Sequence, residues 1–180
     1  HVGGIHRPKP ALADLDADGD LDLYVGDNDG YIVYYSNDGL VARDFRSLPN
    51  FGSLTTVDLP QWTFVTDRWE NMDISWRVAP AFVDIDYDGD QDLLAGAGDG
   101  RITFFRNIGT PTTPAWRFVT SQYADIDVGS YAAPAFADID ADGDYDLFIG
   151  NSDGYVVFYR NIGTREEAIW MFVTDDYLGT

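Results

Sequence analysis

Three short segments of the sequence each carry five aspartates at alternate positions, with glycine at the sixth place. Alternate carboxylates in a curling loop can face one ion, and glycine allows the sharp turn that brings later ligands to it. Hard oxygens in this number favour Ca²⁺ over the smaller Mg²⁺. We therefore predict three calcium sites, with side chains binding at positions 1, 3, 5 and 9 and the carbonyl at position 7. The candidate metal residues are Asp14, Asp16, Asp18, Asp20, Asp22, Asp84, Asp86, Asp88, Asp90, Asp92, Asp138, Asp140, Asp142, Asp144 and Asp146.

Other uses of such segments fit less well. An EF-hand loop ends in a bidentate glutamate at position 12, but that position is Val25, Ala95 or Ile149 here. Merely solvated Asp-rich turns are the plainer alternative, which three full copies disfavour. Without metal each segment crowds five carboxylates, so we expect repulsion to destabilise the metal-free chain. Three bound Ca²⁺ would change the formal charge from −20, by +6, to −14.

The aspartate segments belong to a longer repeat. Each is followed by an apolar run that ends in glycine, at Gly26, Gly96 or Gly150, then by an Asp-Gly turn and an aromatic-rich strand. A Trp-x-Phe-Val-Thr strand completes each copy. Its first residues are Trp62, Trp116 and Trp170. We predict an all-β fold with three repeats of four antiparallel strands, each with one Asp-x-Asp-x-Asp-Gly-x-x-Asp calcium loop.

The spacing of the copies sets the predicted boundaries. We expect one repeat domain over residues 1–180, with units at 1–69, 70–123 and 124–180. The first unit carries an insertion, at about 40–55, that has no counterpart in the other two. A partner-binding loop and a tolerated surface excursion are both open interpretations of it.

The third strand of the repeat is apolar on both faces. In the last copy Tyr155, Val157 and Tyr159 alternate with Val156 and Phe158. Such a strand belongs to a sheet that is covered on both sides. Propeller-type blades packed face to face satisfy this, whereas a lone sheet with one wet face does not.

Charge and composition exclude several classes of partner. With 31 acidic and 11 basic residues, the chain would repel phosphates, so no nucleic-acid partner is expected. Cysteine is absent, which removes disulfides and thiolate zinc sites. No apolar run approaches the roughly 20 residues of a membrane helix, which predicts no membrane insertion. Because no secretory signal precedes His1, we expect a processed chain or a fragment.

The repeat resembles the FG-GAP/VCBS-type calcium-binding repeat, which is similar to the repeats of integrin α-chains. The shared features are the Pro-Ala-Phe-x-Asp-x-Asp-x-Asp-Gly-Asp-x-Asp-Leu run, a Gly-x-x-Asp-Gly turn and an Arg-Asn-x-Gly element. That last element stands at residues 106–109 and 160–163, while the first unit has Ser36 in place of arginine. The resemblance implies a calcium-stabilised β-propeller with one repeat per blade. It also implies an extracellular or cell-surface module for adhesion, recognition of a glycan or protein, or structural support.

Three units are few for a propeller. Closed propellers have about four to eight blades, so three alone would leave apolar sheet faces bare. We therefore expect either further blades or self-association, as a six-blade dimer or a head-to-tail fibre.

Tryptophans are the candidates for ligand contact. Trp62, Trp116 and Trp170 recur in every unit, which favours packing over sugar stacking. Trp69 and Trp76 do not recur as tryptophan, since the matching residues are tyrosine or serine. We therefore expect Trp69 and Trp76 to form an exposed recognition patch.

Catalytic machinery is sparse. The only histidines are His1 and His6, and Lys9 is the only lysine. The pair Asp125 and Asp127 has the residue types for glycoside hydrolysis, but chance proximity is the better interpretation in so acidic a chain. We predict a non-enzymatic adhesion, recognition or structural module, with no catalytic residues. The alternatives are a self-assembling subunit of a ring or extracellular fibre, and a fragment of a propeller-bearing polysaccharide-degrading enzyme.

Overall fold

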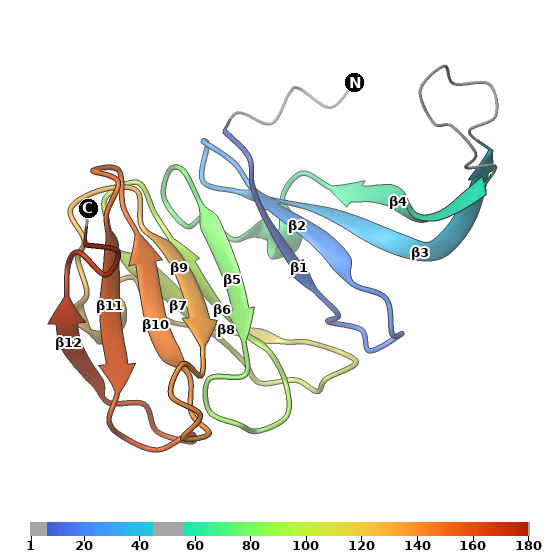
Figure 1. Ribbon diagram of the computed structural model, residues 1–180. Helices are drawn as coiled ribbons and strands as arrows, with labels where there is room; N and C mark the ends of the chain where they lie inside the picture. Colours follow the sequence, from blue (N-terminus) through green and yellow to red (C-terminus); the bar gives the residue numbers. More distant parts are fainter. Residues whose placement is uncertain (1–6, 45–55, 180) are drawn as a thin grey trace.

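The computed structural model describes residues 7–44 and 56–179, and these form three antiparallel sheets of four strands (Figure 1). In each sheet, strands adjacent in sequence are paired. The first sheet contains β1 (Lys9–Ala13), β2 (Asp22–Gly26), β3 (Ile32–Asp44) and β4 (Thr56–Thr66). The second sheet contains β5 (Ala79–Val83), β6 (Asp92–Gly96), β7 (Ile102–Asn107) and β8 (Trp116–Thr120). The third sheet contains β9 (Ala133–Ala137), β10 (Asp146–Gly150), β11 (Val156–Asn161) and β12 (Trp170–Thr174). The predicted all-β class with three four-stranded antiparallel units is confirmed. No helix within the described ranges is long and apolar enough to cross a membrane.

The turn between the second and third strands is set by the Asp-Gly pair. Gly30, Gly100 and Gly154 have φ of +99°, +87° and +88°, a left-handed conformation that glycine adopts without steric cost. At Gly30 an added Cβ would also lie 2.3 Å from the backbone oxygen of Ser75. The turn therefore also packs closely against the segment that leads into the next sheet.

The three sheets lie side by side, because β5 contacts both β1 and β9. One face of the second sheet contributes Leu93 and Phe105 to a core shared with the first sheet. Its other face contributes Leu94 and Phe104 to a core shared with the third sheet. The second sheet is thus covered on both faces, as expected for strands that are apolar on both faces.

An aromatic residue after the fourth strand is placed between neighbouring sheets. It begins the short 3₁₀ turns η1 (Trp69–Asn71) and η2 (Tyr123–Asp125). Trp69 is 6% exposed, and its ring centroid lies 4.8 Å from that of Tyr24 and 5.2 Å from that of Trp116 in the next sheet. The expectation that Trp69 belongs to an exposed recognition patch is therefore wrong, because its ring fills the space between two sheets.

The insertion in the first unit lengthens a hairpin. Residues 40–44 continue β3 and pair with residues 56–60 of β4, from Leu40 opposite Pro60 to Asp44 opposite Thr56. Figure 1 shows this hairpin extending away from the other strands. Residues 45–55 lie outside the described residues, so the partner-binding interpretation stays a prediction.

The two edges of the molecule carry different kinds of loop. Strands β1, β5 and β9 run in the same direction, so the loops that follow them emerge at the lower edge in Figure 1. The other edge carries the Asp-Gly turns and the segments between sheets, joined by backbone hydrogen bonds such as Val78 N–H to Asp27 O at 2.9 Å. The aspartate loops occupy the lower edge.

Candidate metal centres

Each candidate metal loop joins the first two strands of a sheet: the first loop is residues 14–22, the second 84–92 and the third 138–146. Two left-handed residues curl it. The residues at position 4, with φ between 54° and 61°, are Ala17, Tyr87 and Ala141, and the glycines at position 6, with φ between 95° and 100°, are Gly19, Gly89 and Gly143. In all three loops the glycine amide donates to the carboxylate at position 1 at 3.1 Å. This bond closes the loop around its own side chains.

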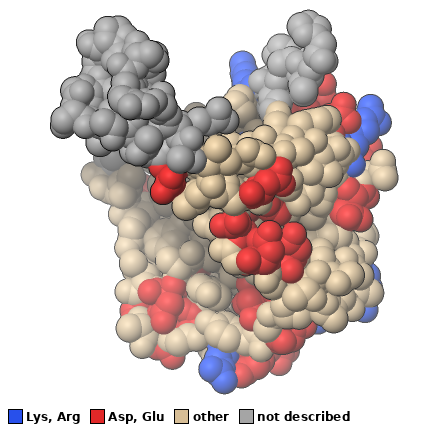
Figure 2. Space-filling model, turned by 90° about the vertical axis from the view of Figure 1, so that its right-hand side faces the viewer, with Lys and Arg blue, Asp and Glu red and all other residues tan. Residues whose placement is uncertain are grey.

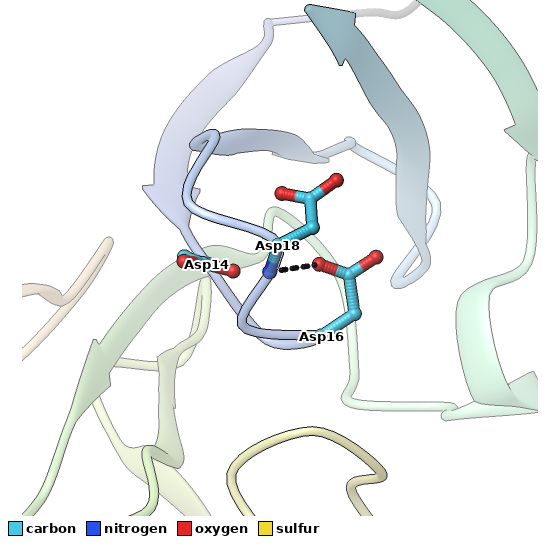
Figure 3. Close-up of side chains that lie close together, drawn as sticks. All are labelled: Asp14, Asp16 and Asp18. Carbon is cyan, nitrogen blue, oxygen red and sulfur yellow. Dashed lines mark hydrogen bonds between the residues drawn. The ribbon is translucent and has the colours of Figure 1, made fainter.

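The aspartates at positions 1, 3 and 5 of each loop converge. Their carboxylates offer oxygens that lie within 4.8 Å of one another. Figure 3 shows this group in the first loop, where Asp18 N–H donates to Asp16 Oδ1 at 3.3 Å. The three groups are Asp14, Asp16 and Asp18; Asp84, Asp86 and Asp88; and Asp138, Asp140 and Asp142. Three hard oxygen donors at this separation suit a divalent cation such as Ca²⁺.

The aspartates at position 9 lie outside those groups and are buried. Asp22, Asp92 and Asp146 are 3%, 1% and 1% exposed. The Oδ1 atom of each accepts a backbone N–H from an asparagine of the third strand, at 2.7–2.9 Å. Burial raises the pKa of Asp92 to about 7, and the negative charge of Asp86 adds to the rise. Position 9 is therefore anchored to the sheet and offers a metal at most its second oxygen.

The aspartates at position 7 were predicted to bind through their carbonyls, which stays a prediction. Their side chains are Asp20, half-buried, and Asp90 and Asp144, both 7% exposed. Burial raises the pKa of Asp90 and of Asp144, and neighbouring aspartates of the same loop raise it further. A cation beside these loops would remove that penalty.

Buried carboxylate oxygens without a partner test whether the loops fit a metal. Such atoms occur in all three loops: Asp14 Oδ1, Asp86 Oδ1, Asp90 Oδ1, Asp92 Oδ2 and Asp144 Oδ1. An unsatisfied buried polar group costs about 1–3 kcal/mol, and more when charged. A hard cation would use these oxygens, so the residues present fit calcium.

Sequence reasoning missed the role of two arginines. Arg106 Nη1 lies 3.1 Å from Asp86 Oδ2, and Arg160 Nη2 forms an ion pair with Asp140 and lies 3.8 Å from Asp142. Each arginine follows the third strand's aromatic residues and reaches the metal loop of its own sheet. The repeated Arg-Asn pair was the available signal.

Sequence reasoning also missed the buried asparagines of the third strand, which end β7 and β11 and lie within β3. Asn37, Asn107 and Asn161 donate the backbone N–H to position 9 of their loop. The side-chain Oδ1 of Asn107 accepts the N–H of Gly109 at 3.0 Å and of Ala115 at 2.9 Å. Asn107 and Asn161 therefore link a metal loop to the segment just before the fourth strand, whereas Asn37 bonds to Gly39 within β3.

The second and third loops are joined directly. The hydroxyl of Tyr87 donates to the carbonyl of Gly143 at 2.9 Å. Its ring stacks on Tyr145, with centroids 5.6 Å apart. In the first loop the residue at this place is Ala17, which has neither group.

The remaining ligand candidates divide by exposure. Trp76 is 45% exposed, as a recognition residue requires. Trp116 and Trp170 are partly buried and pack against the two cores, which agrees with the packing interpretation, and Trp62 is 39% exposed. Asp127 is held by Arg101, whose Nε lies 3.6 Å away.

Figure 2 shows the end of the molecule that carries the first sheet, with acidic side chains in several patches and basic ones few and scattered.

Residues 84–149 match the family model of the FG-GAP-like repeat. Comparison with curated proteins and with solved structures finds no match. The matched range starts at the first aspartate of the second loop and ends in β10, so it takes in two of the three aspartate loops. The chain therefore carries the FG-GAP-like repeat over residues 84–149.

Proposed function

We propose that this protein is a calcium-stabilised recognition module that works outside the cell. The observation that carries the calcium part is the set of buried, unpartnered carboxylate oxygens in all three aspartate loops. Each loop ends at a buried position-9 aspartate that is bonded to the third strand. Calcium in the loop would therefore hold two strands of the sheet in place as well as neutralise charge.

The recognition part of the proposal rests on the repeat. The FG-GAP-like repeat suggests an adhesion or recognition module, although a fold class alone does not fix a ligand. Extracellular calcium modules bind with dissociation constants of about 10⁻⁴ to 10⁻³ M. Loops with dissociation constants in that range would stay loaded at extracellular calcium concentrations, so an extracellular location is part of the proposal.

A non-catalytic role agrees with how the acidic residues are used. Of the pair considered for glycoside chemistry, Asp127 pairs with Arg101 and its Oδ1 accepts the N–H of Gly129 at 2.9 Å. It holds a turn between sheets. We therefore propose binding, and not turnover, as the activity.

Calcium titration of chelator-treated protein tests the proposal. We expect three equivalents of bound calcium by calorimetry and a rise in the thermal unfolding midpoint. Asp138→Asn should remove one equivalent, because Asp138 supplies one of three converging carboxylates. The matched control Asp67→Asn, at an exposed position outside the loops, should keep all three. Absence of binding heat together with an unchanged midpoint would overturn the calcium part.

Self-assembly is a second candidate because the end sheets present apolar faces. Tyr177 follows β12 as Trp69 follows β4, and its ring packs 5.1 Å from those of Phe148 and Phe158. Tyr123 at the same place also contacts the next sheet, through Trp170, whereas Tyr177 is 43% exposed. The first sheet of a second copy is a suitable cover, since it exposes Leu12, Trp62 and Phe64 (54%, 39% and 43%).

Light scattering at about 1 mM calcium, within the range of extracellular modules, tests this second candidate. We expect a dimer or longer assembly, and a monomer for Tyr177→Asp, which places a charge on the face. The control Asp153→Asn, at an exposed turn of the same sheet, should assemble like the parent chain. A parent chain that is monomeric at all concentrations would rule the assembly out.

A further inference from the structure

A small basic cavity lies at the edge opposite the aspartate loops. Its lining is Arg7, Lys9, Arg77, Tyr131 and Ala132, and its volume is about 180 Å³. No acidic residue lines it, although the chain carries 31 acidic and only 11 basic residues. Among the described residues, Arg7, Lys9 and Arg77 take part in no ion pair. Three cations without protein counter-ions therefore surround one cavity.

The cavity is a product of the repeat. Arg7, Arg77 and Tyr131 each stand three residues before the proline of an inner strand, in β1, β5 and β9. All three have left-handed φ, of 56°, 58° and 58°, a conformation that costs side-chain-bearing residues about 1–3 kcal/mol. The backbone of Arg77 and of Tyr131 is held there by bonds of 3.2 Å from their N–H groups to carbonyls in the preceding Asp-Gly turns. Equivalent positions of neighbouring units thus converge on one space.

The guanidinium of Arg77 is fixed by its neighbours in an orientation that can bind an anion. Its guanidinium lies 4.1 Å from the ring centroid of Tyr131 and 4.8 Å from that of Trp76. Its Nε donates to Asn28 Oδ1 at 3.1 Å. The Nη groups have no partner among the described residues, and a planar guanidinium with fixed orientation suits a carboxylate.

Trp76 does not line the cavity itself, but it lies against Arg77 and Tyr131, which do. Its ring lies 5.6 Å from that of Tyr131. It packs on Gly98, where an added Cβ would lie 2.6 Å from the indole. The matching pair in the third unit is Ser130 and Ser152, which bond to each other. Because the other unit replaces the Trp–Gly pair with serines, the fold does not require an aromatic residue here, and 45% of Trp76 remains exposed.

We propose that this cavity binds the carboxylate of an acidic sugar residue, a uronate, with the sugar ring against Trp76. The cations supply the counter-charge, and the exposed part of the Trp76 indole offers an aromatic contact for the C–H groups of a sugar. The cavity is smaller than the roughly 300–1,000 Å³ of drug-sized sites, so one ring and its carboxylate is the matching size. The strong net negative charge disfavours long polyanions, which points to an acidic residue on an otherwise neutral glycan. This inference rests on the proposed recognition function and names its ligand class.

Calorimetric or NMR titration of the calcium-loaded chain with methyl glucuronide, and with methyl glucoside as the neutral match, tests the proposal. We expect at least about tenfold tighter binding of the glucuronide, the size of one charge-assisted hydrogen bond. Arg77→Gln should weaken glucuronide binding by about tenfold or more, and Trp76→Ala should weaken both sugars. Lys9→Gln should weaken glucuronide binding several-fold without a risk to folding, because the Lys9 side chain is exposed and has no partner among the described residues. Arg117→Gln, an exposed arginine on β8, is the control and should change nothing.

Each other outcome counts against the proposal. Equal binding of both sugars, or glucuronide binding unchanged in Arg77→Gln and Lys9→Gln, overturns the role of the cations. If acetate binds as tightly as the glucuronide, the sugar ring has no role in binding. If an acidic peptide binds more tightly than the glucuronide, the ligand is a protein and the sugar proposal is wrong. If none of these probes binds while calcium titrates normally, the cavity proposal fails and the calcium proposal stands.

Discussion

The first aspartate loop and the third differ in how the protein balances their charge. In the third sheet Arg160 reaches Asp140 and Asp142 from the neighbouring strand. At the matching place in the first sheet the residue is Ser36, whose hydroxyl bonds to Asp38 instead. The two loops have the same aspartate spacing, yet among the described residues only the third loop has a cation from the protein. The first loop should therefore depend more on bound metal.

The first loop has a neutral hydrogen-bond donor, Tyr34, which contacts the aspartate at position 9. The hydroxyl of Tyr34 donates to Asp22 Oδ2 at 2.9 Å. The equivalent oxygen in the second loop, Asp92 Oδ2, is buried and has no hydrogen-bond partner. Burial raises the pKa of Tyr34, and its hydrogen bond to Asp22 raises it further, so the phenol keeps its proton. A neutral donor satisfies a hydrogen bond but leaves the net charge of the loop unchanged. The comparison shows that the ligand geometry and its charge compensation vary separately among the repeats.

Removal of calcium is expected to have the largest effect and to separate the loops. At about 10 mM calcium and dissociation constants of about 10⁻⁴ to 10⁻³ M, three sites together contribute about 4–8 kcal/mol to the free energy of unfolding. We expect that contribution to be lost on chelation. Hydrogen exchange should rise most in residues 14–26, because no arginine of the described ranges pairs with the first loop. Equal protection loss in all three loops would contradict the comparison.

The asparagines give the next largest contrast. Asn107→Ala removes the acceptor of two backbone N–H groups, those of Gly109 and Ala115. The side chain of Asn37 also makes two hydrogen bonds, but longer ones: its oxygen accepts the N–H of Gly39 at 3.2 Å, and its Nδ2 donates to the carbonyl of Leu21 at 3.3 Å. At about 1–3 kcal/mol for each buried group left unsatisfied, we expect the free energy of unfolding to fall by about 2–4 kcal/mol in Asn107→Ala. The loss should be smaller in Asn37→Ala, because Asn37 is 9% exposed against 2% for Asn107 and its bonds are longer. Urea unfolding in saturating calcium measures both, and a larger loss in Asn37→Ala would contradict the prediction.

Much of this architecture could be predicted from sequence because it is local. Alternate aspartates with glycine at position 6, Asp-Gly turns and strands apolar on both faces all act within a few residues. The role of Arg160 could not be derived in that way, because it depends on the register between β10 and β11, which places residue 160 beside a loop about 20 residues earlier. Burial of Trp69 was missed for a related reason: its contacts come from two different sheets. The left-handed φ of Ala17 also carries no signal in the residue type.

Tyr87→Phe is expected to have a smaller effect, confined to the second and third loops. The change removes the bond from the hydroxyl to Gly143 O and keeps the stack on Tyr145. One exposed hydrogen bond contributes about 0.5–1 kcal/mol, so the unfolding midpoint should fall slightly. The sharper readout is coupling: calcium binding to the third loop should weaken, while the first loop is unaffected. Site-resolved NMR titration separates the three, and Tyr155→Phe, at an exposed position outside the loops, is the control.

The smallest effect is expected when the missing arginine is supplied to the first sheet. Ser36→Arg places a guanidinium where Arg106 and Arg160 stand in the other sheets, because residues 36, 106 and 160 share one place in the strand register. A partly exposed ion pair contributes about 0.2–1 kcal/mol, so chelated protein should unfold at a slightly higher urea concentration. In calcium the gain should vanish or change sign, because the new cation competes with the metal for the carboxylate of Asp16. Ser36→Ala controls for the lost bond to Asp38, and Arg106→Ser should show the opposite pattern in the second loop. If Ser36→Arg stabilises the calcium-loaded and chelated chains equally, charge compensation is not what distinguishes the first loop.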